Sequence, residues 1–201
     1  MSELIKEEKQ LDGSLKDLVK IKRHLINLFL MTSFWSLSSF GMYLVNYSLK
    51  NISGDFFKNN LLSAVIDVPI SILSGFLYQK FGLSKVLSAF FFASMAGGIT
   101  IVLFSESNPS LVPIMVAFAK GGVKVNLDIC YLGNSFLFPS IFAGTAFGIC
   151  NAAAKISTIL SPLLAEAEPP VPMIIFSILA AIGSVTPMFL RKGPVEGSKN
   201  H

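Results

Sequence analysis

The sequence predicts an all-α integral membrane bundle of six transmembrane helices. The chain is 52% hydrophobic, only 14% of its 201 residues are charged, and its long apolar stretches alternate with short polar connections. A helix needs roughly 20 mostly apolar residues to span a bilayer. Backbone groups in lipid must be satisfied internally, and these stretches lack the alternating pattern of a membrane barrel. Helices are therefore the expected secondary structure.

The apolar stretches define the expected domain organisation. The six expected spans cover residues 25–49, 57–79, 86–104, 111–133, 137–163 and 171–190. They form one membrane domain over 25–190, between a cytoplasmic tail over 1–24 and a second cytoplasmic tail over 191–201. Ser14 and Asp17 have the spacing of a helix capping box, which predicts a short interfacial helix in the first tail.

The basic residues predict the orientation. If Met1 is cytoplasmic, the inner side carries Lys6, Lys9, Lys16, Lys20, Lys22, Arg23, Lys80, Lys85, Arg191, Lys192 and Lys199, and the outer connections carry only Lys50 and Lys58. This bias follows the positive-inside rule, so we expect both termini in the cytoplasm. It also accounts for the isoelectric point near 9.1 without a nucleic-acid partner. The expected partner is the lipid bilayer, of the plasma membrane rather than an organelle.

The sequence lacks the motifs of an enzyme. His24 and His201 have no acid or nucleophile at motif distance, and there is no glycine-rich phosphate loop or metal-ligand cluster. Cys130 and Cys150 fall in apolar stretches without CxxC spacing, so we interpret them as packing residues. No catalytic residue, metal or cofactor is expected.

Two features of the second span and the following loop form a known pattern. Asp67 and Pro69 give an acid, any residue and a proline early in the span. Residues 75–82 then follow a loop pattern of glycine, three residues, acid, arginine, one residue and glycine, except that Gln79 replaces the acid and Lys80 the arginine.

Further matches follow in the last third of the chain, at residues 119–122, Tyr131, 138–140, 154–157 and Pro162. Together these residues resemble the organic cation and organic anion transporters, solute carriers of the major facilitator superfamily, over about residues 14–190. The resemblance is to the C-terminal half of a twelve-helix transporter, whose substrate lies between two six-helix halves. It implies transport of small organic ions by alternating access, as a homodimer or with a separate N-terminal half. The alternative is a non-transporting membrane subunit or an inactive remnant.

One departure from the family concerns an ion pair at the inner side. The family has a glutamate shortly before the phenylalanine-proline pair and an arginine after it, whereas this chain has about Asn134 and Ala143 there. We therefore expect this latch to be missing. Small residues at four-residue spacing, Gly144, Gly148 and Ala152, predict close helix packing, and Gly97 belongs to a shorter stripe.

Charged residues inside the spans are candidates for function because an ionised group at the bilayer centre costs about 2.5–3.5 kcal/mol. Lys120, Lys124 and Asp128 lie at successive i, i+4 positions, where Lys124 and Asp128 can pair. For Lys120 two interpretations stay open: contact with an anionic substrate, or an intramembrane ion pair with Asp67.

Lys155 is the deepest charge of the fifth span, and we expect it to face the cavity. It matches an arginine of organic anion transporters, so the resemblance implies recognition of anions, which we favour slightly over cations; the alternative is a structural lysine. Trp35, Phe40 and Tyr43 resemble cavity-lining aromatic positions that stack on flat substrates. Their alternative role is helix packing.

Overall fold

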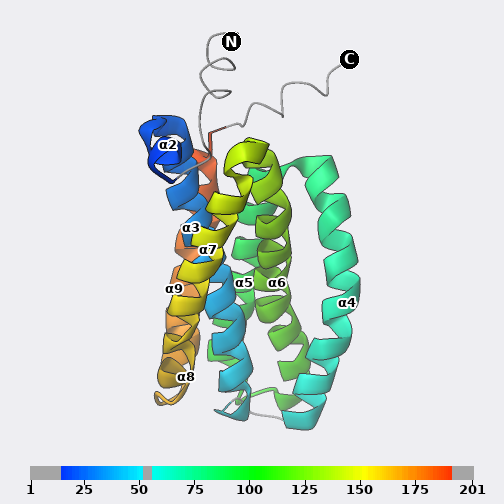
Figure 1. Cartoon of the computed structure of the whole chain (residues 1–201). Helices are drawn as coiled ribbons and strands as arrows, with labels where there is room; N and C mark the ends of the chain where they lie inside the picture. The colour runs from blue at the N-terminus through cyan, green and yellow to red at the C-terminus, as the bar shows by residue number, and fades with distance from the viewer. Residues whose placement is uncertain (1–14, 52–55, 192–201) are drawn as a thin grey trace.

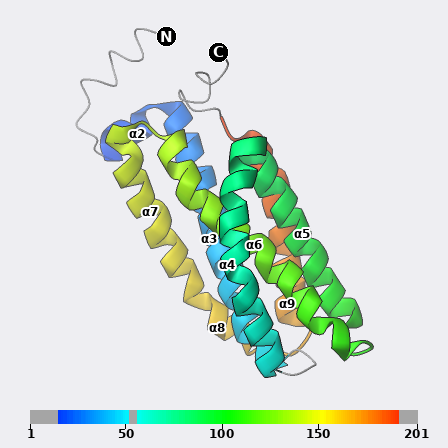
Figure 2. The ribbon, with the colours of Figure 1, turned by 90° about the vertical axis from the view of Figure 1, so that its right-hand side faces the viewer.

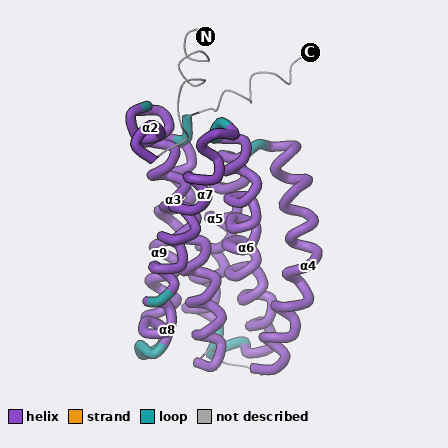
Figure 3. Tube along the Cα trace, viewed as in Figure 1, coloured by secondary structure: helices purple, strands orange, loops and turns teal. Residues whose placement is uncertain are grey.

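The computed structural model describes residues 15–51 and 56–191, and this part of the chain is helical, without strands. Long helices run side by side in one bundle (Figures 1 and 3). The elements are α2 (Leu15–Lys20), α3 (Lys22–Ser48), η1 (Leu49–Asn51), α4 (Phe56–Phe81), α5 (Leu83–Phe104), η2 (Pro109–Leu111), α6 (Val112–Leu137), α7 (Ser140–Thr158), α8 (Leu160–Ala165), α9 (Val171–Val185) and η3 (Thr186–Phe189). The prediction of an all-α membrane bundle is confirmed.

The described helices match the predicted spans to within about one helical turn. Five segments are long and apolar enough to cross a membrane: Lys22–Asn51, Leu83–Phe104, Pro109–Leu137, Ser140–Ala165 and Val171–Phe189. α4 is not among these five, although its 26 residues give it sufficient length and it lies against α6. The predicted capping box includes Ser14, which lies outside the described residues, but α2 follows it and buries Leu18 completely.

The centre of the bundle is formed by α3, α5 and α6. α5 packs against α6 and α9, and α3 packs against α6 and α7. α4 stands at the edge of the bundle, where α6 is its main neighbour (Figures 1 and 2). The largest buried side chains of this core include Phe34, Trp35, Phe91 and Phe176. One broad face of α4 and one of α7 are therefore left uncovered by the described chain.

Glycines permit the closest helix contacts within this core. A Cβ at Gly97 of α5 would lie 2.5 Å from the backbone nitrogen of Ala119 in α6, so only glycine fits there. The stripe on α7 behaves differently, because ideal Cβ atoms at Gly144 and Gly148 meet nothing within 4 Å. The predicted close packing thus occurs at Gly97, whereas the α7 stripe packs against no part of the described chain.

The helix of the fifth expected span is interrupted at Ile159, which separates α7 from α8. Pro162 has no N–H to donate to the carbonyl four residues earlier, that of Thr158. Side-chain hydroxyls reinforce the turn before the interruption: Ser157 donates to the carbonyl of Ala154 at 2.8 Å, and Thr158 donates to that of Lys155 at 2.8 Å. Lys155 therefore lies about one turn before the break.

Polar tethers close both ends of the bundle. At the end where α2 and η3 lie (Figure 1), the buried Asn27 amide donates to the Arg191 carbonyl at 2.9 Å and accepts from the Arg191 N–H at 3.0 Å. At the other end, Lys50 forms an ion pair with Glu166 at 2.5 Å. These contacts join residues far apart in sequence: the start of α3 is bound to the last part of the described chain, and η1, which follows α3, is bound to the residue after α8.

Candidate functional site

A charged cluster joins α4 to α6 within the bundle. Lys120 Nζ lies 3.1 Å from Asp67 Oδ2, and the Lys120 side chain is only 7% exposed. The helices bring these groups together because α4 lies along α6, with Asp67 near the middle of α4 and Lys120 about two turns into α6. A lysine and a carboxylate at this distance form an ion pair.

A second pair lies one helical turn further along α6. Lys124 Nζ is 2.5 Å from Asp128 Oδ1, as the i, i+4 spacing predicts. Ser71 of α4 completes the arrangement: its hydroxyl accepts from Lys124 at 2.8 Å and donates to Asp128 Oδ2 at 2.8 Å. Each lysine of the cluster thus has its own carboxylate.

The structure contains the contact that one of the two interpretations of Lys120 requires, and contact with a substrate stays a prediction. The structure shows the ion pair with Asp67, so Lys120 is not left over after Lys124 and Asp128 pair. An anionic substrate would have to displace Asp67 to reach it. The cluster as a whole carries no net charge from these four residues.

Lys155 is in a different environment. Its side chain is exposed on α7, and Nζ lies 6.0 Å from the centroid of the Tyr43 ring of α3. Within the described part of the chain it makes no ion pair. Lys155 is therefore an intramembrane cation that an aromatic face, rather than a carboxylate, accompanies.

A separate group of aromatic side chains joins α3, α6 and α7. Trp35 contacts Tyr131 edge to face at 4.6 Å between ring centroids, and Phe147 at 5.2 Å. Trp35 is only 1% exposed, whereas Tyr131 and Phe147 reach the surface. The indole thus supports these two rings from beneath instead of lining a cavity.

Phe40 and Tyr43 are both half-buried on α3, and Tyr43 also stacks on Tyr47. Sequence reasoning did not single out Phe147 and treated Tyr131 only as part of a resemblance. One signal could have found Phe147: it precedes Lys155 by eight residues, which places both on one side of a helix. Lys155 with its neighbour Tyr43, together with the adjacent rings of Phe147 and Tyr131, is called the lysine face below.

A neutral contact occupies the place of the family's ion-pair latch. Asn134 Nδ2 donates to the carbonyl of Ala143 at 2.9 Å. The two positions where the resemblance implies an ion pair are thus in contact, but through one uncharged hydrogen bond. Such a bond contributes less than a charge-assisted one.

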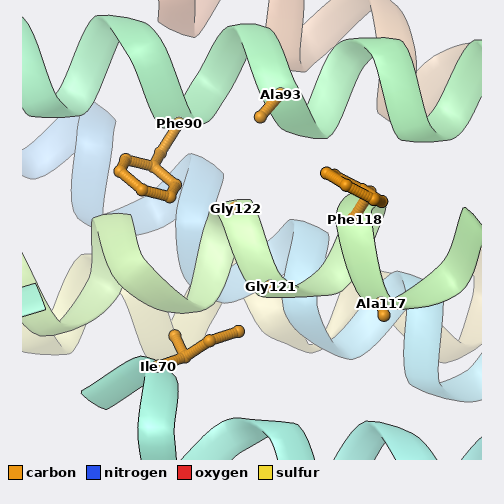
Figure 4. Close-up of a pocket in the computed structure, with 7 residues that line it drawn as sticks. All are labelled: Ile70, Phe90, Ala93, Ala117, Phe118, Gly121 and Gly122. Carbon is orange, nitrogen blue, oxygen red and sulfur yellow. The ribbon is translucent and has the colours of Figure 1, made fainter. Parts of the chain in front are cut away.

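A pocket between α4, α5 and α6 lies close to the charged cluster and is a second candidate site. Figure 4 shows Ile70 of α4 facing Gly121 and Gly122 of α6, with Phe90 of α5 on the far side. Its volume is about 300 Å³, and its lining residues carry no charge. It offers no group that would orient an ion, so the lysine face is the better candidate site.

These features define a multi-pass α-helical membrane protein with paired charges inside the bundle and, on the described part of α7, an exposed lysine beside the Tyr43 ring. No family model matches the chain. It is similar to the organic cation/carnitine transporter 2 of Homo sapiens, with 24% identity over 190 residues, which cover 91% of this chain and 33% of that protein.

Two further curated relatives agree. Organic anion transporter 3 of Rattus norvegicus is 22% identical over 166 residues, covering 81% of this chain and 31% of that protein. Solute carrier family 22 member 13 of Homo sapiens is 23% identical over 203 residues, covering 100% of this chain and 37% of that protein. The resemblance to organic cation and organic anion transporters is confirmed, and the chain spans about a third of the length of these relatives.

Proposed function

We propose that this chain takes part in moving small organic anions across a membrane by alternating access, as six helices of a larger transporter assembly. The observation that carries the proposal is Lys155, an intramembrane cation without a carboxylate partner in the described chain. An ionised residue at this depth is costly unless it has a partner or a role. A substrate carboxylate would supply the partner.

The neighbouring groups favour anions that also carry an aromatic ring. Lys120 and Lys124 are already neutralised by Asp67 and Asp128, so they add no attraction for an anion. Tyr43, Tyr131 and Phe147 present ring surface on the lysine face. Flat organic acids would pair with Lys155 and stack on these rings.

Uptake assays test the proposal. Cells expressing this chain, alone and together with a candidate N-terminal half, are given labelled aromatic carboxylates and matched organic cations. We expect uptake of the carboxylates to exceed that of the cations. Equal or greater uptake of cations would contradict the anion preference. No uptake under either condition would support a non-transporting subunit, a role that the neutral Asn134–Ala143 contact also favours.

The orientation is a separate expectation, and tags test it. Lys22, Lys80, Lys85 and Arg191 lie at the end of the bundle that carries α2. Because basic residues are retained on the cytoplasmic side, tags at both termini should be cytoplasmic and a tag near Asn51 external. Protease protection in sealed vesicles measures this. Digestion of a terminal tag from outside would contradict the orientation.

Association with a second six-helix unit is also expected, because α7 leaves its small-residue stripe uncovered. Gly148→Leu should weaken association at least tenfold while leaving the fold intact, since a Cβ there meets nothing in the chain itself. The matched change Gly97→Leu should instead destabilise the bundle, because it clashes with the backbone of α6.

Crosslinking and native mass measurement in mild detergent would follow the assembly, and thermal unfolding would follow the fold. A Gly148→Leu variant that associates like the unmodified chain would show that this face is not the interface. Monomers alone for the unmodified chain, with normal stability, would contradict association altogether.

A further inference from the structure

We propose that the protein binds the headgroup of an anionic phospholipid at the end of the bundle that carries α2 and Arg191. The site is a cavity of about 500 Å³ at the junction of α4 with α5. Its wall also includes the end of α6 and the chain that follows α9. This site is separate from the lysine face, and the proposal rests on the residence of the chain in a membrane and on the proposed orientation.

The described residues of the cavity wall carry only positive charge. Lys85 and Arg191 line the cavity, and none of its other described lining residues is acidic. Both side chains are exposed, and in the part of the chain that the structure describes neither forms an ion pair. An arginine fork can bind two phosphate oxygens at once, and a lysine adds a compact charge. The pair therefore suits a phosphate group.

Hydrogen bonds hold the wall in place. The two bonds between the fully buried Asn27 amide and the Arg191 backbone fix where the arginine leaves the bundle. Ser84 of α5 donates to the carbonyl of Pro187 at 2.6 Å, which ties η3 to the start of α5. These two tethers set the positions from which Arg191 and Lys85 extend. The cavity is thus built by the fold and not by loose surface side chains.

The backbone at the start of α5 adds to the positive potential. Gly82 is the residue before the helix, its φ is 78°, and it makes no side-chain capping bond. Only glycine adopts that conformation readily, and it leaves the first N–H groups of α5 without a capping side chain. These groups carry partial positive charge at the cavity wall.

Apolar side chains around the same cavity favour a lipid over free phosphate. Met188 is 75% exposed and Phe81 is 49% exposed, and both line the cavity. Because they lie at helix ends, they are placed at the boundary between headgroups and acyl chains. A phospholipid can satisfy both parts of the site, with its phosphate on the cations and an acyl chain along Met188. Anionic lipids are concentrated in the cytoplasmic leaflet, where our proposed orientation places this end.

Native mass spectrometry of the full chain in mild detergent tests the proposal. The protein is titrated with phosphatidylserine and, in parallel, with phosphatidylcholine. We expect preferential retention of phosphatidylserine. Lys85→Gln and Arg191→Gln should each lower its affinity about fivefold, the effect expected of one basic residue near an anionic lipid. Lys85→Arg should retain binding.

Controls separate this site from general surface charge. Lys22→Gln removes an exposed lysine at the same end but outside the cavity, and it should leave the affinity unchanged. If Lys22→Gln lowered the affinity for phosphatidylserine as much as Lys85→Gln does, the proposal would be overturned. Equal retention of phosphatidylserine and phosphatidylcholine would also overturn it. Millimolar inorganic phosphate should not displace phosphatidylserine. Complete displacement would show that the cavity recognises phosphate alone and would overturn the lipid assignment.

Discussion

Replacing Lys155 with alanine is expected to reduce uptake of aromatic anions at least tenfold while leaving the amount of protein in the membrane unchanged. The change removes the cation of the lysine face, so a substrate carboxylate loses its charged partner. Abundance should hold because Lys155 has no carboxylate within the described chain that the change would strand. Uptake and surface abundance are measured in the same cells.

Two variants sharpen this test. Lys155→Arg keeps the charge and should retain anion uptake, although an arginine is wider and alters the fit. Tyr43→Leu removes the ring 6.0 Å from Nζ and should weaken uptake of aromatic anions more than that of aliphatic ones. If Lys155→Ala lowered the amount of protein in the membrane and left uptake per molecule unchanged, Lys155 would be a structural residue. This result would contradict its proposed contact with the substrate.

Replacing Lys120 with methionine is expected to lower the free energy of unfolding by about 3–5 kcal/mol, because it leaves Asp67 without its counter-ion. The contact is 3.1 Å long and the Lys120 side chain is almost fully buried. Asp67→Leu should cost a similar amount for the reciprocal reason. The double variant, with both residues apolar, should recover most of the loss, since replacing a buried pair by packed hydrophobic groups is often neutral.

Denaturant unfolding in detergent measures this cycle. The second pair supplies a matched control, the variant Lys124→Met. Asp128 then loses its lysine but keeps its hydrogen bond from Ser71 at 2.8 Å, so its carboxylate still has a polar partner. We expect a smaller effect there. Losses that simply add in the Asp67/Lys120 double variant would contradict the energetic coupling of the pair.

The positions of the helices could be predicted from the sequence because the length of each apolar stretch determines them. The length of an apolar stretch fixes where a span begins and ends, and the charged residues before the apolar stretches, Arg23 and Lys85, lie in the first turns of α3 and α5. The Lys124–Asp128 contact was equally accessible, because an i, i+4 spacing needs only the helix itself.

Contacts between helices were less accessible to sequence reasoning. Both interpretations of Lys120 were consistent with the chain, because choosing between them requires knowing that α4 lies against α6. Gly97 and Gly148 belong to similar small-residue stripes, yet one faces α6 and the other faces outward. Trp35 looked like a cavity residue, but Tyr131 and Phe147, from two other helices, cover it.

The Asp67–Lys120 pair also constrains how the chain enters the bilayer during synthesis. Asp67 is made before Lys120, and α5 and the following turn must emerge between them. Until α6 follows, α4 carries a carboxylate without the lysine that neutralises it, and insertion of that carboxylate is unfavourable. We therefore expect stable integration of α4 to depend on α6, which would make these two helices a unit of membrane insertion although a complete helix separates them in the sequence.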